Sequence, residues 1–154
     1  MPKQIKVLLV SSSGGHLVQL SRIYEKLSAY DFVLMTTAEK NQVPNTLKEL
    51  PYTQLPEANQ KTPLKVIGLG ALLNKEIMKI KPDIVISTGA APGAISLVIA
   101  KLRVGSRCIW VDSLANTQQL SLSGRLVKKF CDLWLSQWED VAEKTGATYM
   151  GKVI

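Results

Sequence analysis

The stretch that decides the fold is residues 5–20, which have the sequence IKVLLVSSSGGHLVQL. Within it, residues 7–10 form an apolar run that is short, β-branched at both ends and followed by a turn of small residues. Such a run predicts a strand that is buried on both faces, as in a parallel sheet. Beyond the turn, apolar residues recur at three- and four-residue steps, which predicts an amphipathic helix. The residues of its apolar face are Leu17, Leu20, Ile23, Leu27 and Tyr30.

The turn between this strand and this helix leads into His16, the only histidine of the chain. A helix that begins here directs free backbone N–H groups and the positive end of its dipole at the turn, which predicts an anion-binding site. His16 suits a general base, because imidazole gains and loses a proton near neutral pH. A role limited to capping the turn or hydrogen-bonding a ligand is equally open.

Strands and helices alternate along the rest of the chain. Further strands are predicted over residues 31–37, 52–55, 84–87, 107–111 and 133–136, with a last edge element over 149–153. Helices are predicted over residues 66–81, 93–102 and 138–144, and after a cap at Ser121 or Ser123. This alternation predicts one α/β domain over residues 1–154, a Rossmann-like, doubly wound parallel sheet of about six to seven strands. Ligands of such sheets bind at the carboxyl ends of the strands, where the turns at 11–16, 87–93 and 112–123 meet.

Composition indicates a globular protein, with 46% hydrophobic and 20% charged residues among 154. No apolar stretch reaches the ~18–20 residues that span a bilayer, and no signal peptide precedes the first strand. We therefore expect a cytoplasmic protein in which Cys108 and Cys131 are reduced packing residues. The net charge of +7 arises in residues 61–129, which hold eleven basic and three acidic residues. Such a region suits nucleic acid, an anionic membrane, a phosphorylated substrate or simply a solvated surface.

The predicted helix over residues 66–81 has a wider apolar surface than one packing contact requires. Its main stripe suits a crossover helix that packs on the sheet, whereas its remaining apolar residues suit a helix that rests on a membrane surface. The expected membrane contacts are Leu72, Lys75, Met78 and Lys79. The predicted helix over residues 93–102 is apolar nearly all round, which indicates either burial or membrane contact.

Several common sites are absent from the sequence. It has neither the G-x-G-x-x-G fingerprint, nor a P-loop, nor a nucleophile elbow, and one histidine with two distant cysteines gives no metal-ligand spacing. Asp112, at the end of the strand predicted over 107–111, is a second candidate for an acid, a base or an orienting group. It equally suits binding of a ligand hydroxyl or capping of the helix that follows.

Three segments resemble a known family: the strand–SGGH–helix unit, PDIVISTGAAPG, and VDSLANTQQLSLSGRLVKKFCDLWLSQW. They resemble the anchor subunit of two-part GT-B glycosyltransferases, both the bacterial PssD-type exopolysaccharide proteins and the eukaryotic membrane subunit of the UDP-GlcNAc transferase that adds the second sugar of the dolichol-linked glycan. More distantly, the chain is similar to the N-terminal half of MurG-type transferases. The resemblance covers nearly the whole chain.

The resemblance implies an acceptor-binding, membrane-recruiting half-enzyme that is inactive without its partner and needs no bound metal. A separate donor-binding GT-B half would hold the UDP-sugar, so that this chain binds no cofactor, and the acceptor would be a glycan on a polyprenyl diphosphate. His16 matches the histidine with a base or diphosphate-contact role, and Asp112 matches the acidic residue of an E/D-S motif. Residues expected near the acceptor and its diphosphate are Ser13, Gly14, Gly15, Thr88, Gly89, Ala90, Gly93, Asn116 and Ser121.

The eukaryotic subunit begins with a transmembrane helix, and this sequence shows none. We therefore expect membrane contact through residues 66–81, 95–103 or both, at the cytoplasmic face of the inner membrane. The alternative function is a stand-alone Rossmann protein that binds a nucleotide or a phosphorylated metabolite. A nucleic-acid-binding module ranks last, because the basic residues are not interleaved with aromatic ones.

Overall fold

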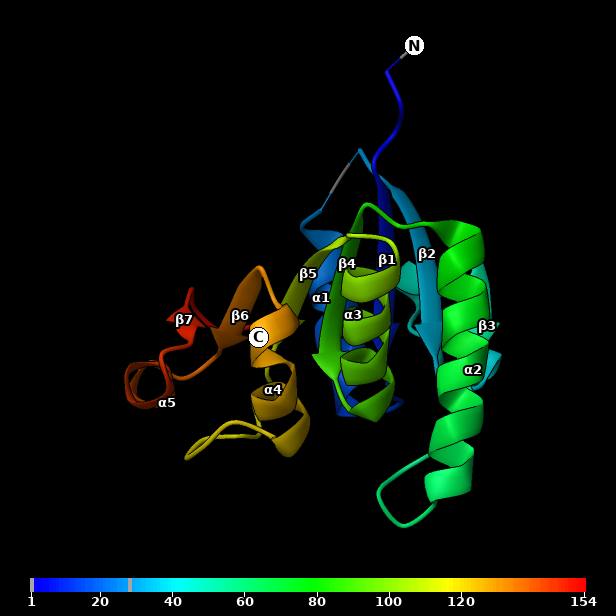
Figure 1. The fold of residues 1–154 in the computed structure, drawn as a ribbon. Coiled ribbons are helices and arrows are strands. Elements are labelled where there is room, and N and C mark those ends of the chain that lie inside the picture. The colour runs from blue at the N-terminus through cyan, green and yellow to red at the C-terminus, as the bar shows by residue number, and fades with distance from the viewer. Residues whose placement is uncertain (1, 28) are drawn as a thin grey trace.

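Strand β1 (Lys6–Ser11) is an interior strand of a seven-stranded parallel sheet in the computed structural model, which describes residues 2–27 and 29–154. The strand order is β3-β2-β1-β4-β5-β6-β7 (Figure 1). Residues Val7–Val10 pair with β2 on one side and with β4 on the other, so this apolar run is buried as predicted. The other strands are β2 (Asp31–Thr36), β3 (Tyr52–Gln54), β4 (Ile84–Gly89), β5 (Arg107–Val111), β6 (Leu133–Ser136) and β7 (Thr148–Tyr149).

Helices cover both faces of the sheet. α1 (Gly15–Glu25) packs on one face, whereas α2 (Pro63–Ile80), α3 (Ala91–Arg103) and α4 (Leu122–Val127) lie on the other (Figure 1). Alternate side chains of β1 enter the two cores: Leu8 packs with α2 and α3, and Leu9 packs with α1. α5 (Glu139–Thr145) lies beside β6 and β7 at one edge, and short 3₁₀ turns occupy Lys40–Gln42, Asn45–Leu47 and Lys128–Phe130. The doubly wound fold predicted from the sequence is confirmed.

The first helix is shorter than its apolar spacing predicts. α1 ends at Glu25, after which the backbone N–H of Lys26 donates to the Ile23 carbonyl and that of Leu27 donates to the Tyr24 carbonyl. Tyr30 therefore lies outside the helix, and its placement on the helical face is wrong. Its ring instead packs edge-on against Phe32 at the start of β2, with the ring centroids 5.9 Å apart.

Two leucines on α3 and α4 are exposed. Leu102 near the end of α3 is 68% exposed and Leu126 on α4 is 66% exposed. α4 has only six residues before the chain tightens into a 3₁₀ turn, so Val127 alone of its large apolar residues is buried. Among the described residues, no helix is both long and apolar enough to cross a membrane.

The face that carries α1 is only partly covered. Beyond α1 a hollow of about 720 Å³ lies over β5 and β6, between the second half of α1 and the segment 150–154. Its floor is apolar, with Ile109, Val111 and Leu135 among the lining side chains. The end of β6, at Ser136 and Gln137, reaches the same hollow.

Candidate functional site

The site is organised around the point where the strand order reverses. β1 leads through α1 to β2 on one side, and its other neighbour, β4, leads through α3 to β5 on the opposite side. Ser11 at the end of β1 pairs with Gly89 at the end of β4, and the N–H of Ser12 donates to the Gly89 carbonyl at 2.8 Å. A doubly wound sheet binds its ligands at this crevice.

His16 joins the two turns of this crevice. It lies in the first turn of α1, and its Nδ1 is 2.8 Å from the carbonyl oxygen of Thr88. The Thr88 hydroxyl donates in return to the His16 carbonyl at 2.6 Å. Because a carbonyl oxygen only accepts, Nδ1 is the protonated nitrogen, which leaves the lone pair of the neutral ring on Nε2. His16 thus has a fixed tautomer with Nε2 as its hydrogen-bond acceptor.

Gly89 makes room for this histidine. A Cβ on Gly89 would lie 2.8 Å from both Cε1 and Nδ1 of His16, and the residue has a φ of +121°. Both facts require glycine here. Glycine is required at position 93 for a different reason. A Cβ there would lie 1.8 Å from Ser87 Oγ, where α3 begins against β4. Gly89 and Gly93 are both buried, so their role is to shape the turn.

Two helix N-termini meet at the His16–Thr88 link. α1 begins at Gly15 and α3 begins at Ala91, and neither has an acidic residue in its first turn. Within residues 2–27 and 29–154, the backbone N–H groups of Gly14, Gly15 and His16 have no protein acceptor. These donors and the two helix dipoles favour an anion, such as a phosphate group.

The end of β1 also holds an unsatisfied polar atom. Ser11 is fully buried, and its hydroxyl finds no hydrogen-bond partner among the described residues. Such groups are rare in folded proteins. A hollow of about 320 Å³ lies beside the same turn, lined by Ser13, Gly14, Leu17, Val18, Gln42 and Pro44. The turn therefore has free donors and room for a ligand next to it.

Asp112 is buried beneath the third turn, with 1% of its surface exposed. Its Oδ1 accepts from Trp110 Nε1 at 3.0 Å and from the Ser121 hydroxyl at 2.6 Å. Its Oδ2 accepts from Asn116 Nδ2 at 2.9 Å and from the Ser121 backbone N–H at 3.0 Å. Four intramolecular donors thus occupy both oxygens, an arrangement that favours the orienting role over the acid–base role.

The predicted site residues fall into two groups. Ser13, Gly14, Gly15 and Ala90 are at least partly accessible at the switch point, and His16 is half-buried between them. The others hold the turns in place: Thr88 bonds to His16, Gly93 packs on Ser87, and Asn116 and Ser121 bond to Asp112. Ser121 also caps α4, since its hydroxyl accepts from the Gly124 N–H, as one of the two predicted caps.

Sequence reasoning missed four residues that shape the site: Gly124, Gln19, Gln137 and Trp138. A Cβ on Gly124 would lie 2.5 Å from Asp112 Oδ1. No local sequence pattern predicts this close approach. Gln19 bonds to Ser113 and to the Leu114 N–H. Its place three residues after His16, on the same helix face, was the available signal.

Neither cysteine offers chemistry to the site. Both are free, as predicted, and burial raises the pKa of Cys108 to about 11 and that of Cys131 to about 12. Their thiols are therefore protonated and unreactive at neutral pH. Among the described residues, no group of three or more histidine, cysteine, aspartate or glutamate side chains is placed to hold a metal ion.

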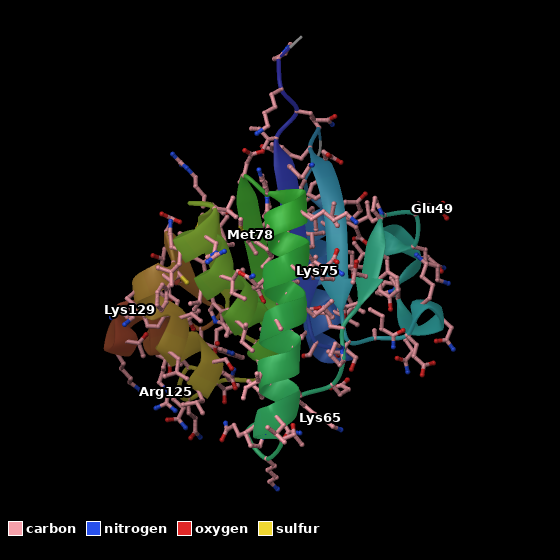
Figure 2. The ribbon with its side chains drawn as sticks, turned by 45° about the vertical axis from the view of Figure 1, so that its right-hand side comes forward. Glu49, Lys65, Lys75, Met78, Arg125 and Lys129 are labelled. Atoms are coloured by element: carbon pink, nitrogen blue, oxygen red, sulfur yellow. The ribbon has the colours of Figure 1, made fainter. Side chains whose placement is uncertain are left out.

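The expected membrane residues of α2 differ in accessibility. Lys75 and Lys79 are exposed, whereas Leu72 and Met78 are only partly exposed and Leu72 packs on the core. The exposed apolar side chains lie earlier in the helix, at Leu64 (82%) and Ile67 (68%). Figure 2 shows Lys65 near the start of α2, Arg125 on α4 and Lys129 in the 3₁₀ turn that follows α4.

Comparison with known proteins identifies the family. The model of the family described as "Oligosaccharide biosynthesis protein Alg14 like" matches residues 61–153, which is more than half of the chain. The chain belongs to the Alg14-like family. A relative in Yarrowia lipolytica, named UDP-N-acetylglucosamine transferase subunit ALG14, is 28% identical over 90% of this chain and 76% of its own. The family resemblance predicted from the sequence is thereby confirmed.

Two solved structures share the fold. MurG of Acinetobacter baumannii superposes with a TM-score of 0.71 over 89% of this chain and 43% of its own, at 13% identity. A UDP-N-acetylglucosamine 2-epimerase superposes with a TM-score of 0.72 over 95% of this chain and 46% of its own, at 15% identity. The Alg14-like chain therefore spans less than half the length of either, and corresponds in fold to one Rossmann-like half of a GT-B protein, as predicted.

Proposed function

We propose that this Alg14-like chain is the acceptor-binding half of a two-part GT-B glycosyltransferase. A separate donor-binding half holds the UDP-sugar, and the acceptor is a glycan on a polyprenyl diphosphate. The observation that carries this proposal is the switch point, where two helix N-termini without acidic residues flank a histidine of fixed tautomer. A diphosphate supplies the charge for the free N–H groups, and the acceptor hydroxyl supplies a proton for Nε2.

In the proposed reaction this chain removes one proton and holds the acceptor in place. The acceptor hydroxyl oxygen attacks the anomeric carbon of the sugar, the bond from that carbon to the UDP oxygen breaks, and UDP leaves with the electron pair. His16 Nε2 takes the hydroxyl proton while Nδ1–H stays bonded to Thr88, which holds the ring in place. The helix N-termini of α1 and α3 fix the acceptor diphosphate, so that its hydroxyl is presented to the partner's donor site.

Support for the partner comes from size and family. The chain spans 43% and 46% of the two solved chains that share its fold, which supports a site that a second half completes. The Yarrowia lipolytica relative is named a subunit of a UDP-N-acetylglucosamine transferase, which favours a UDP-sugar of that class.

A reconstitution experiment tests this function. The chain is co-expressed with the product of a neighbouring reading frame that encodes a second Rossmann half, and transfer from UDP-GlcNAc to a polyprenyl-diphosphate-linked sugar is measured. We expect transfer by the pair and none by either protein alone. Tight UDP-GlcNAc binding by this isolated chain would contradict the proposal and would favour the stand-alone Rossmann alternative.

The same proposal includes recruitment of the protein to a membrane. The protein surface that contacts the membrane is the exposed start of α2. Leu64 and Ile67 are exposed beside Lys65, and Arg125 of α4 lies toward the same lower end of the molecule in Figure 2. Such a mixture suits the headgroup region of an anionic cytoplasmic leaflet, where each well-placed cation contributes about 1 kcal/mol.

Vesicle flotation checks this surface. The doubly substituted Leu64→Ser, Ile67→Ser protein is expected to bind vesicles of phosphatidylglycerol and phosphatidylcholine about tenfold more weakly, because two apolar insertions are lost. The matched control is Met150→Ser, which removes a side chain of similar exposure (71%) outside α2 and α4. Equal binding by the double variant and the wild type would exclude this surface.

A further inference from the structure

Gln137 is a buried amide that joins three segments around the site. It follows β6 directly and is 1% exposed. Its Nε2 donates to Gln19 Oε1 at 2.6 Å and to the Asp112 carbonyl at 2.9 Å, while its Oε1 accepts from the Val153 N–H at 2.7 Å. A backbone N–H only donates and a carbonyl only accepts, so the orientation of this amide is fixed.

Each of the three bonds reaches a different part of the molecule. Gln19 lies on α1 one turn after His16, so its bond holds the helix that carries the candidate base. The carbonyl of Asp112 begins the loop whose fold depends on the Asp112 carboxylate. Val153 belongs to the segment 150–154, which is otherwise largely exposed.

The neighbouring tryptophan makes a parallel connection. Trp138 Nε1 donates to the Leu114 carbonyl at 2.8 Å, and the Lys152 ammonium lies 3.9 Å from the centre of the Trp138 ring. The Leu114 N–H in turn donates to Gln19 Oε1 at 3.1 Å. Two adjacent side chains thus connect the same segment, 150–154, to the same loop and the same helix.

We infer that Gln137 is a positioning residue that couples segment 150–154 to the placement of His16 and of the loop 112–121. This inference rests on the proposed transferase function. Gln137 touches none of the reacting groups; it sets the distance between α1 and the loop through the Gln19 and Asp112 bonds. A displacement of segment 150–154 therefore changes the geometry of the site.

The variant Gln137→Met keeps the length of the side chain and removes all three bonds. In the reconstituted pair we expect kcat to fall about tenfold or more, because misplaced catalytic groups lose rate steeply. The KM for UDP-GlcNAc stays within about twofold of the wild type, because the donor lies on the partner. Val153→Pro removes the N–H that donates to Gln137 Oε1 and leaves the Gln137 side chain unchanged, and it is expected to lower kcat in the same way.

Two further measurements separate positioning from general stability. Ser106→Ala is the matched control, because Ser106 is 2% exposed, makes one buried bond to the Pro82 carbonyl at 2.6 Å and lies before β5, at the opposite end of that strand from Asp112. It is expected to lose stability without losing kcat. Amide hydrogen exchange in the isolated chain is expected to quicken over residues 112–121 and at Leu17 and Val18, the first bonded amides of α1, in Gln137→Met but not in Ser106→Ala.

A double-substitution cycle completes the test. Gln19→Met and Gln137→Met both remove the bond between these two residues, so the combined variant is expected to lose less kcat than the product of the two single losses. Unchanged kcat in Gln137→Met, or unchanged kcat in Val153→Pro, overturns the coupling while the wild-type pair still transfers. Absence of transfer by the wild-type pair would instead reject the proposed function, and the exchange measurement would still decide the role of Gln137.

Discussion

Replacing His16 by alanine is expected to lower sugar transfer by the reconstituted pair at least about 100-fold, the usual contribution of a general base. The ring makes one side-chain hydrogen bond, from Nδ1 to the Thr88 carbonyl, so little of the stability of the fold depends on it. We therefore expect the thermal unfolding temperature to change by only a few degrees. Transfer is measured with both substrates saturating, and complex formation by size-exclusion chromatography.

Two further substitutions separate the roles of the two ring nitrogens. Asparagine places an N–H donor close to the position of Nδ1 and offers nothing at Nε2, whereas glutamine places an amide near Nε2 that cannot take a proton. A base at Nε2 requires that both variants be as inactive as His16→Ala. Full transfer by His16→Asn would reduce His16 to a link between the two turns. Full transfer by His16→Gln would reduce it to a hydrogen-bonding contact with the ligand.

How much of this site could be predicted depends on whether the signal is local. The apolar run of β1 and the glycine turn before α1 are local signals, and both predict the observed elements. The pairing of His16 with Thr88 is a contact between residues 72 apart, and it follows only from the strand order that brings β1 beside β4. Sequence could place each residue on a turn, but not the hydrogen bond between them.

The hydrogen bonds of the buried polar residues could not be predicted from the sequence either. Nothing in the sequence around Gln19 or Gln137 predicts that these two residues contact each other. The hydrogen bond between them joins residues that are 118 positions apart in the chain. Leu102 and Leu126 lie on exposed apolar helix faces, and apolar periodicity alone does not decide whether such a face is buried or meets another surface. Whether a neighbouring element covers that face is a tertiary fact, and here none of the described residues does so.

Asp112 is the second residue whose replacement is expected to have a large effect, and that effect is on stability. Whichever way the amide of Asp112→Asn is turned, its NH₂ group faces two of the four donors that the carboxylate accepts. Buried donors without an acceptor cost about 1–3 kcal/mol each, so we expect a loss of about 3 kcal/mol. For a domain of this size that lowers the unfolding temperature by about 6–12 °C.

A perturbation of the loop that leaves the carboxylate intact makes this test decisive. A Cβ on Gly124 would lie 2.5 Å from Asp112 Oδ1 and 2.8 Å from Trp110 Nε1, so Gly124→Ala displaces the same network. Gly70→Ala on α2, where a Cβ meets nothing within 4 Å, is the matched control and is expected to be neutral or slightly stabilising. If Asp112 orients the loop, Gly124→Ala and Asp112→Asn both lose stability, and both lose transfer even at temperatures where they are folded. A base would behave differently, because Asp112→Asn would then abolish transfer while Gly124→Ala retained it at temperatures where both variants are folded.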